Sequence, residues 1–275
     1  MTSLTWSLLF ALPIGAATGV LAGLFGIGGG LVMVTALVWL LPTLAVPPEH
    51  VMHVALASSL GAIVLTAASS ARSHYRRGAI LWPSLSRLVP GMLIGGVLGA
   101  RMAGQLSTQW LQWGVIAFCF VAAWEMWRPK STHAADDAGA TPKHWQLVPG
   151  GFAIGIVSAL VGIGGGSMTV PLLIHFGAKP VRAVGTSAAC GLPIAVAAVI
   201  GFAWTKSSPN AAMPPHTIGF LHWPLALALG STSILFAPYG ARLAHKLPGN
   251  SLRRAFAGLL VVVALMTWYR TSMIA

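Results

Sequence analysis

The scarcity of charge over long stretches of the chain is the strongest constraint on its fold. Residues 5–71 contain a single charged side chain, that of Glu49. Only 7% of the 275 residues are charged and 56% are hydrophobic, whereas an average soluble domain carries about 25% charged residues. Since a helix needs roughly 20 mostly apolar residues to cross a bilayer, these uncharged runs predict an all-α polytopic membrane protein.

The chain contains the same series of motifs twice. Residues 15–30 end in Leu-Phe-Gly-Ile-Gly-Gly-Gly, and residues 151–166 end in Leu-Val-Gly-Ile-Gly-Gly-Gly, at an offset of 136. Trp82-Pro83 returns as Trp223-Pro224 at an offset of 141. A looser match relates Ala-Ser-Ser at 57–59 to Gly-Thr-Ser at 185–187. Such internal repetition predicts two copies of one structural unit.

The motifs and the polar stretch between them define three parts of the chain. We expect a first membrane repeat at 1–127, a cytoplasmic linker at 128–144 and a second membrane repeat at 145–275. Each repeat contains five apolar segments. They are 4–25, 30–46, 50–72, 80–100 and 107–127 in the first, and 146–161, 166–178, 182–204, 217–240 and 252–269 in the second.

The basic residues predict how these segments cross the membrane. If the first two segments of each repeat form a glycine-broken hairpin and the other three span, 13 of the 16 Lys and Arg residues fall on one side. Cytoplasmic loops carry an excess of Lys and Arg, so this side is predicted to be cytoplasmic and both termini to lie outside. The repeats are then inverted relative to each other. Eight simple spans with parallel repeats would put basic loops on both sides, which disfavours that alternative.

The two Gly-Ile-Gly-Gly-Gly runs are the first candidate for a binding site. Adjacent glycines disfavour helix by about 1 kcal/mol each relative to alanine, and short glycine-interrupted segments at matching places in two halves point to a transporter site. If the helices restart at Leu31 and Ser167, their free N–H groups would attract an anion. The alternative is that the glycines serve close helix packing. The candidate residues here are Gly28, Gly29, Gly30, Leu31, Gly164, Gly165, Gly166 and Ser167.

Hydroxyl side chains at matching places in the two repeats form the second candidate. Ser58, Ser59, Thr186 and Ser187 lie within apolar segments, where they could donate hydrogen bonds to an oxyanion. Alternatively, they bond back to their own helix or join neighbouring helices.

Several other functions lack the residues that they need. Glu125 is the one carboxylate inside an apolar segment, and it lies at the segment end, which argues against a cation pump. Cys119 and Cys190 stand apart, and the histidines lack metal-ligand spacing, so we predict no catalytic residues, no metal and no cofactor. The net charge of +12 comes from short loops rather than a basic domain, so no nucleic-acid partner is expected.

At these motifs the sequence resembles the sulfite exporter TauE/SafE family, also called the transmembrane sulfur uptake family. The resemblance rests on residues 23–30, 161–173 and 183–187 and covers both repeats. It implies a permease for sulfur-containing anions such as sulfite or sulfonates in the bacterial inner membrane. Thr35 stands where Pro171 stands in the second repeat, and Ala-Ser-Ser at 57–59 departs from Gly-Thr-Ser. The two halves are therefore expected to form sites of unequal definition.

The resulting hypothesis is a secondary transporter that moves a small sulfur-containing anion across the inner membrane by alternating access. Its partners would be that anion and the lipid bilayer. An accessory or structural membrane subunit and a membrane-embedded enzyme are the alternatives. The exact substrate, the direction of transport, a coupling ion and the oligomeric state stay open.

Overall fold

A computed structural model describes residues 3–25, 29–127, 144–205, 213–244 and 249–274. These residues form ten α-helices, two short 3-10 turns and one two-stranded ribbon. The helices are α1 (Ser3–Phe25), α2 (Gly30–Leu40), α3 (Val51–Arg76), α4 (Trp82–Ala103), α5 (Thr108–Trp127), α6 (His144–Val161), α7 (Gly166–His175), α8 (Pro180–Trp204), α9 (Trp223–Ala244) and α10 (Gly249–Ile274). The 3-10 turns, η1 (Leu41–Leu44) and η2 (Pro48–His50), join α2 to α3.

The helices correspond in order to the ten predicted apolar segments, with one clear difference before α9. A helical segment was expected from residue 217, but β1 (Thr217–Ile218) and β2 (Leu221–His222) form a small antiparallel ribbon there. His216 and Gly219 both have positive φ, 69° and 59°, which breaks any helix at this point. The helix begins only at Trp223, with Pro224 in its first turn, where proline is well tolerated.

Four of the described helices are both long and apolar enough to cross a membrane. These spans are Thr5–Leu24, Pro48–Arg76, Pro180–Trp204 and Arg254–Ser272. Three further helices, α4, α5 and α9, have 22, 20 and 22 residues, which at 1.5 Å per residue is about 30 Å or more. By contrast, α2 and α7 have only 11 and 10 residues, too few to cross a bilayer.

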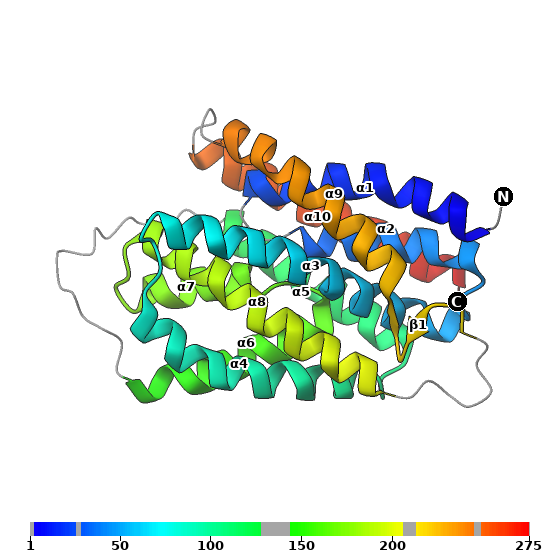
Figure 1. Ribbon diagram of the computed structural model, residues 1–275, viewed down its shortest axis with the longest axis horizontal. Helices are drawn as coiled ribbons and strands as arrows, with labels where there is room; N and C mark the ends of the chain where they lie inside the picture. The colour runs from blue at the N-terminus through cyan, green and yellow to red at the C-terminus, as the bar shows by residue number, and fades with distance from the viewer. Residues whose placement is uncertain (1–2, 26–28, 128–143, 206–212, 245–248, 275) are drawn as a thin grey trace.

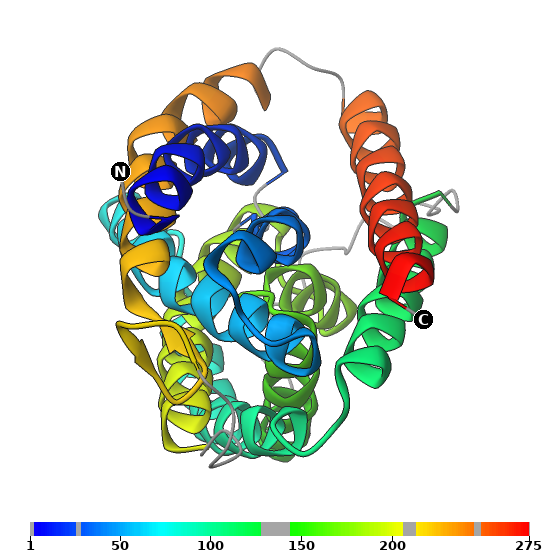
Figure 2. The ribbon, with the colours of Figure 1, turned by 90° about the vertical axis from the view of Figure 1, so that its right-hand side faces the viewer.

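The helices run along the long axis of the molecule (Figure 1). α3 lies near the centre, and its residues 51–60 are all buried. Viewed end-on, α5 and α10 stand side by side on the right, while α1 and α9 form a pair at the upper left (Figure 2). The hairpin of α1 and α2 starts and ends at the same end of the bundle (Figure 1).

Contacts between helices come in matching sets. α1 packs along α9, and α6 packs along α4, which are the counterparts in the sequence repeat. α3 packs against its own counterpart α8, and α5 against its own counterpart α10. The principal helix contacts therefore repeat when the two halves are exchanged.

Glycines permit the closest of these contacts. A side chain on Gly19 of α1 would meet the Ser233 backbone of α9, with a Cβ to Cα distance of 2.7 Å. A side chain on Gly155 of α6 would lie 2.6 Å from the carbonyl oxygen of Met92 in α4. Ser233 and Met92 are themselves separated by the offset of 141. Small residues thus bring the two backbones together in both halves, as is common between membrane helices.

Most helix ends that carry basic residues lie at one end of the bundle. The end of α3, the start of α4, the start of α8, the end of α9 and the start of α10 are all at the left in Figure 1. We call this the basic end. α1 begins and α10 ends at the opposite end (Figure 1).

Candidate functional site

Both short helices begin at the glycine runs. Gly29 precedes α2 with φ 66°, and Gly165 precedes α7 with φ 71°. Only glycine adopts this left-handed conformation without a cost of about 1–2 kcal/mol. The helices start at Gly30 and Gly166, one residue earlier than the expected Leu31 and Ser167.

The start of α2 lies against the glycine run that precedes α7 in the other half. A side chain on Gly30 would collide with the carbonyl oxygen of Gly162 in the other half. A side chain on Gly162, which also has positive φ (75°), would lie 3.0 Å from the Ser59 Oγ. Of the predicted site residues, Gly28 alone lies outside the described residues. The start of α2 and the glycine run of the second half thus meet at a junction between the halves, with Ser59 beside it.

The candidate hydroxyls divide into two pairs with different surroundings. The backbone N–H of His222 donates to the Ser58 Oγ over 3.1 Å, and the N–H of Leu81 donates to the Thr186 Oγ1 over 2.8 Å. Each of these bonds joins one half of the chain to the other, and Thr186 also donates to the carbonyl oxygen of Arg182 (2.7 Å). Ser58 and Thr186 therefore have structural partners.

Ser59 and Ser187 lie next to the glycine runs instead. The Ser187 Oγ donates to the carbonyl oxygen of Gly166 at the start of α7, over 3.2 Å. The Ser59 Oγ donates to Leu56 of its own helix, over 2.9 Å, and it faces Gly162. Of the four predicted hydroxyls, these two are closest to the helix starts.

A cavity of about 660 Å³, including its open part, lies beside the start of α7. Gly164, Gly166 and Ser187 line it at one end. Ala22 and Gly23 of α1 and Ala237 of α9 form other parts of its wall. Three of the predicted site residues therefore face one continuous space.

Polar residues of α3 continue this cavity toward the basic end. Thr66, Ser70 and His74 line it, and their spacing of four residues places them on one face of the helix. His74 is in the last turn of α3. We did not predict these three residues. The four-residue spacing of these hydroxyls and the histidine is visible in the sequence, but it does not indicate which neighbouring helix the three side chains face.

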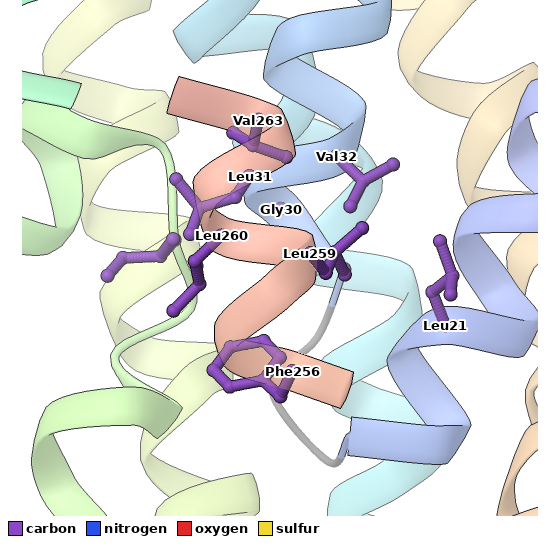
Figure 3. A pocket seen from close by; sticks show the side chains of 10 residues that line it. Leu21, Gly30, Leu31, Val32, Phe256, Leu259, Leu260 and Val263 are labelled. Carbon is purple, nitrogen blue, oxygen red and sulfur yellow. The ribbon is translucent and has the colours of Figure 1, made fainter. Parts of the chain in front are cut away.

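The start of α2 faces a different kind of space. A second pocket of about 350 Å³, including its open part, is lined by Gly29, Gly30 and Leu31 together with apolar side chains of α10. Figure 3 shows Leu31 and Val32 opposite Phe256, Leu259, Leu260 and Val263, with Leu21 at the side. The surroundings of the two helix starts thus differ. The start of α7 faces a cavity lined by hydroxyl groups, whereas the start of α2 faces a pocket lined by apolar side chains.

The described part of the chain holds no group of three or more His, Cys, Asp or Glu side chains arranged to bind a metal. Cys119 and Cys190 are free and buried in different helices. His53 is buried and bonds through its Nε2 to the carbonyl oxygen of Leu106, over 2.9 Å. His175 is exposed at the end of α7.

Residues 11–267 match the sulfite exporter TauE/SafE family. The chain belongs to this family. It is 35% identical over 260 residues to a "Probable membrane transporter protein" of Haemophilus influenzae, covering 94% of this chain and 97% of that protein. The chain is therefore a multi-pass membrane transporter, as the sequence predicted.

More distant relatives carry similar names. "Probable membrane transporter protein MJ0441" of Methanocaldococcus jannaschii is 24% identical over 269 residues, covering 95% of this chain and 97% of that protein. "Probable inner membrane transporter protein TsaS" of Comamonas testosteroni is 26% identical over 187 residues, covering 68% and 72%. No solved structure matches the chain.

Proposed function

We propose that this TauE/SafE transporter moves a small sulfur-containing anion, such as sulfite or an organosulfonate, across the bacterial inner membrane by alternating access. One observation carries the proposal: the cavity that joins the start of α7 to the basic end. Its inner part holds Gly164, Gly166 and Ser187. Backbone N–H groups at a helix start and a nearby hydroxyl are suitable donors for an oxyanion. The family name supports sulfur as the central atom.

The lining suits an anion better than a cation. The described lining residues include hydroxyls and His74 but no carboxylate. The positive end of the α7 dipole adds a favourable field for negative charge. Of the residues that the sequence predicted to bind substrate, those at the start of α7 and Ser187 form the centre of the proposed site. The start of α2, with Ser59, is proposed as its counterpart.

The matching helix contacts support two inverted repeats and a rocking motion between them. In each half a long helix leads to a glycine break and a short helix, and such discontinuous helices at a repeat interface are typical of secondary transporters. The gathering of basic helix ends supports a cytoplasmic basic end, with both termini outside. The printed name of the Comamonas relative supports the inner membrane.

Purified protein in liposomes tests the proposal. We expect labelled sulfite, or a labelled taurine-like sulfonate, to accumulate in protein-containing vesicles faster than in empty ones, and unlabelled anion to compete. Gly165→Leu, which would place a side chain against Ile194, is the matched inactive variant. Equal uptake by empty, wild-type and variant vesicles across the sulfur anions would reject the proposed function.

A further inference from the structure

The hydroxyl of Ser158 in α6 is buried and has no hydrogen-bond partner among the described residues. Its side chain is 0% exposed, and its Oγ makes no hydrogen bond to any described residue. A buried hydroxyl without a partner is unfavourable. The carbonyl oxygen of Ser158 is used, since it accepts from the N–H groups of Gly162 and Ile163 over 2.9 and 3.0 Å.

Ser158 lies beside the start of α7. A methyl group on Gly165 would lie 3.4 Å from the Ser158 Oγ. The equivalent contact occurs in the first half, where a methyl group on Gly29 would lie 3.1 Å from the Ala22 Cβ. Ala22 and Ser158 are separated by the offset of 136. The two residues therefore hold the same position in their repeats.

The surroundings of these counterparts differ in this structure. Ala22 and Gly23 line the cavity that leads to the basic end. Their counterparts Ser158 and Ala159 are both 0% exposed. Gly99 packs closely on α6 and its counterpart Gly240 packs closely on α1, so the difference lies in the cavity and not in these glycine contacts. The structure thus has the α1 position open and the α6 position closed.

We propose that Ser158 binds the anion in a second state, in which a cavity between α6 and the start of α2 opens toward the end opposite the basic end. This inference rests on the proposed function, because alternating access exchanges the conformations of the two repeats. In that state Ser158 lines the new cavity as Ala22 lines the present one, and Ser59 lies beside the start of α2 as Ser187 now lies beside the start of α7. Both hydroxyls then donate to an oxyanion beside the start of α2.

Cysteine labelling from each side of the membrane tests this inference without assuming an orientation. Cys119→Ala with Cys190→Ala provides the cysteine-free background. Ala22→Cys and Ser158→Cys are then treated with 2-(trimethylammonium)ethyl methanethiosulfonate, a membrane-impermeant cationic thiol reagent that does not belong to the proposed substrate class, in right-side-out and inside-out vesicles. We expect each cysteine to react at least tenfold faster from one side, and the two to react from opposite sides. Labelling of both from the same side, or of Ala22→Cys alone, would overturn the inference.

Ser158→Ala gives a second measurement that does not require a new side chain to fit. Since the Oγ makes no hydrogen bond to a described residue, thermal stability should be unchanged or higher. We expect the KM for methanesulfonate presented from the side that labels Ser158→Cys to rise about fivefold. An unchanged KM from both sides would contradict the role of Ser158. If the wild type transports no sulfur anion, the proposed function fails, whereas the labelling pattern still reports on the second cavity.

Discussion

The Ser58 Oγ of α3 accepts a 3.1 Å hydrogen bond from the backbone N–H of His222, which ends β2. Both residues are 0% exposed. The other half repeats this arrangement, with the N–H of Leu81 bonded to Thr186 of α8. In each case the donor immediately precedes the tryptophan that begins α4 or α9. Two equivalent hydrogen bonds therefore fix the start of one helix against a helix of the other repeat.

Loss of these hydroxyls should weaken the contact between the halves. We expect Ser58→Ala to lower the free energy of unfolding by about 1–3 kcal/mol, because the N–H of His222 would be left buried without its acceptor. Thr186→Val should have a similar effect through Leu81. Chemical unfolding in detergent measures both. Ser231→Ala is the control, since that hydroxyl is exposed and bonds only within α9, to Ala228, and its loss should change stability by no more than about 0.5 kcal/mol.

A methyl group at Gly165 should impair transport. Gly165→Ala places an L-residue at φ 71° and against the Ile194 side chain, so the start of α7 must shift. We expect transport in liposomes to fall at least tenfold while the protein still inserts into the membrane. Gly114→Ala in α5 is the matched control, because its new methyl group would meet nothing within 4 Å and alanine favours helix. Equal loss of transport in both variants would argue against a special role for the α7 start.

The glycine breaks were predictable because local chemistry alone determines them. Consecutive glycines disfavour helix wherever they occur, and the two runs predicted the starts of α2 and α7 to within one residue. The partners of Ser58 and Thr186 were not predictable in the same way. Their donors, His222 and Leu81, lie 164 and 105 residues away in sequence, so the bonds depend on how the halves pack.

The sequence also did not predict which neighbouring helix each helix face contacts. Thr66, Ser70 and His74 form a stripe that is visible in the sequence, but it lines a cavity only because α9 packs against α3 and α1 contributes Ala22 and Gly23 to the wall. The departures of the first repeat from the second predicted two sites of unequal definition, but not how their surroundings differ. Leu31 at the start of α2 packs with α10 in an apolar pocket, whereas Gly166 of α7 faces hydroxyls, and this difference depends on contacts between distant helices.

Substitution of His74 should affect recognition of the anion at the basic end of the cavity. His74 lines the cavity, and Arg77 follows it at the end of α3. We expect His74→Ala to raise the KM for anion presented from this end several-fold, with a smaller change in kcat, because a polar group is lost from the entrance. His175→Ala provides the comparison, since His175 is also in the last turn of a helix but is exposed. A KM that is the same in both variants and the wild type would exclude a role for His74.

The folded state should lose stability on acidification, and His222 should contribute to this loss. Burial lowers the pKa of His222, which lies in the ribbon before α9, and the nearby charge of His216 lowers it further. Below the ordinary histidine pKa of about 6.5 the unfolded chain therefore binds a proton that the folded chain resists. Stability is present above this pH and falls as the pH drops through it. We expect unfolding in detergent at pH 7.5, 6.5 and 5.5 to show this decline, and His222→Asn to reduce its slope. An unchanged slope in His222→Asn would contradict this contribution.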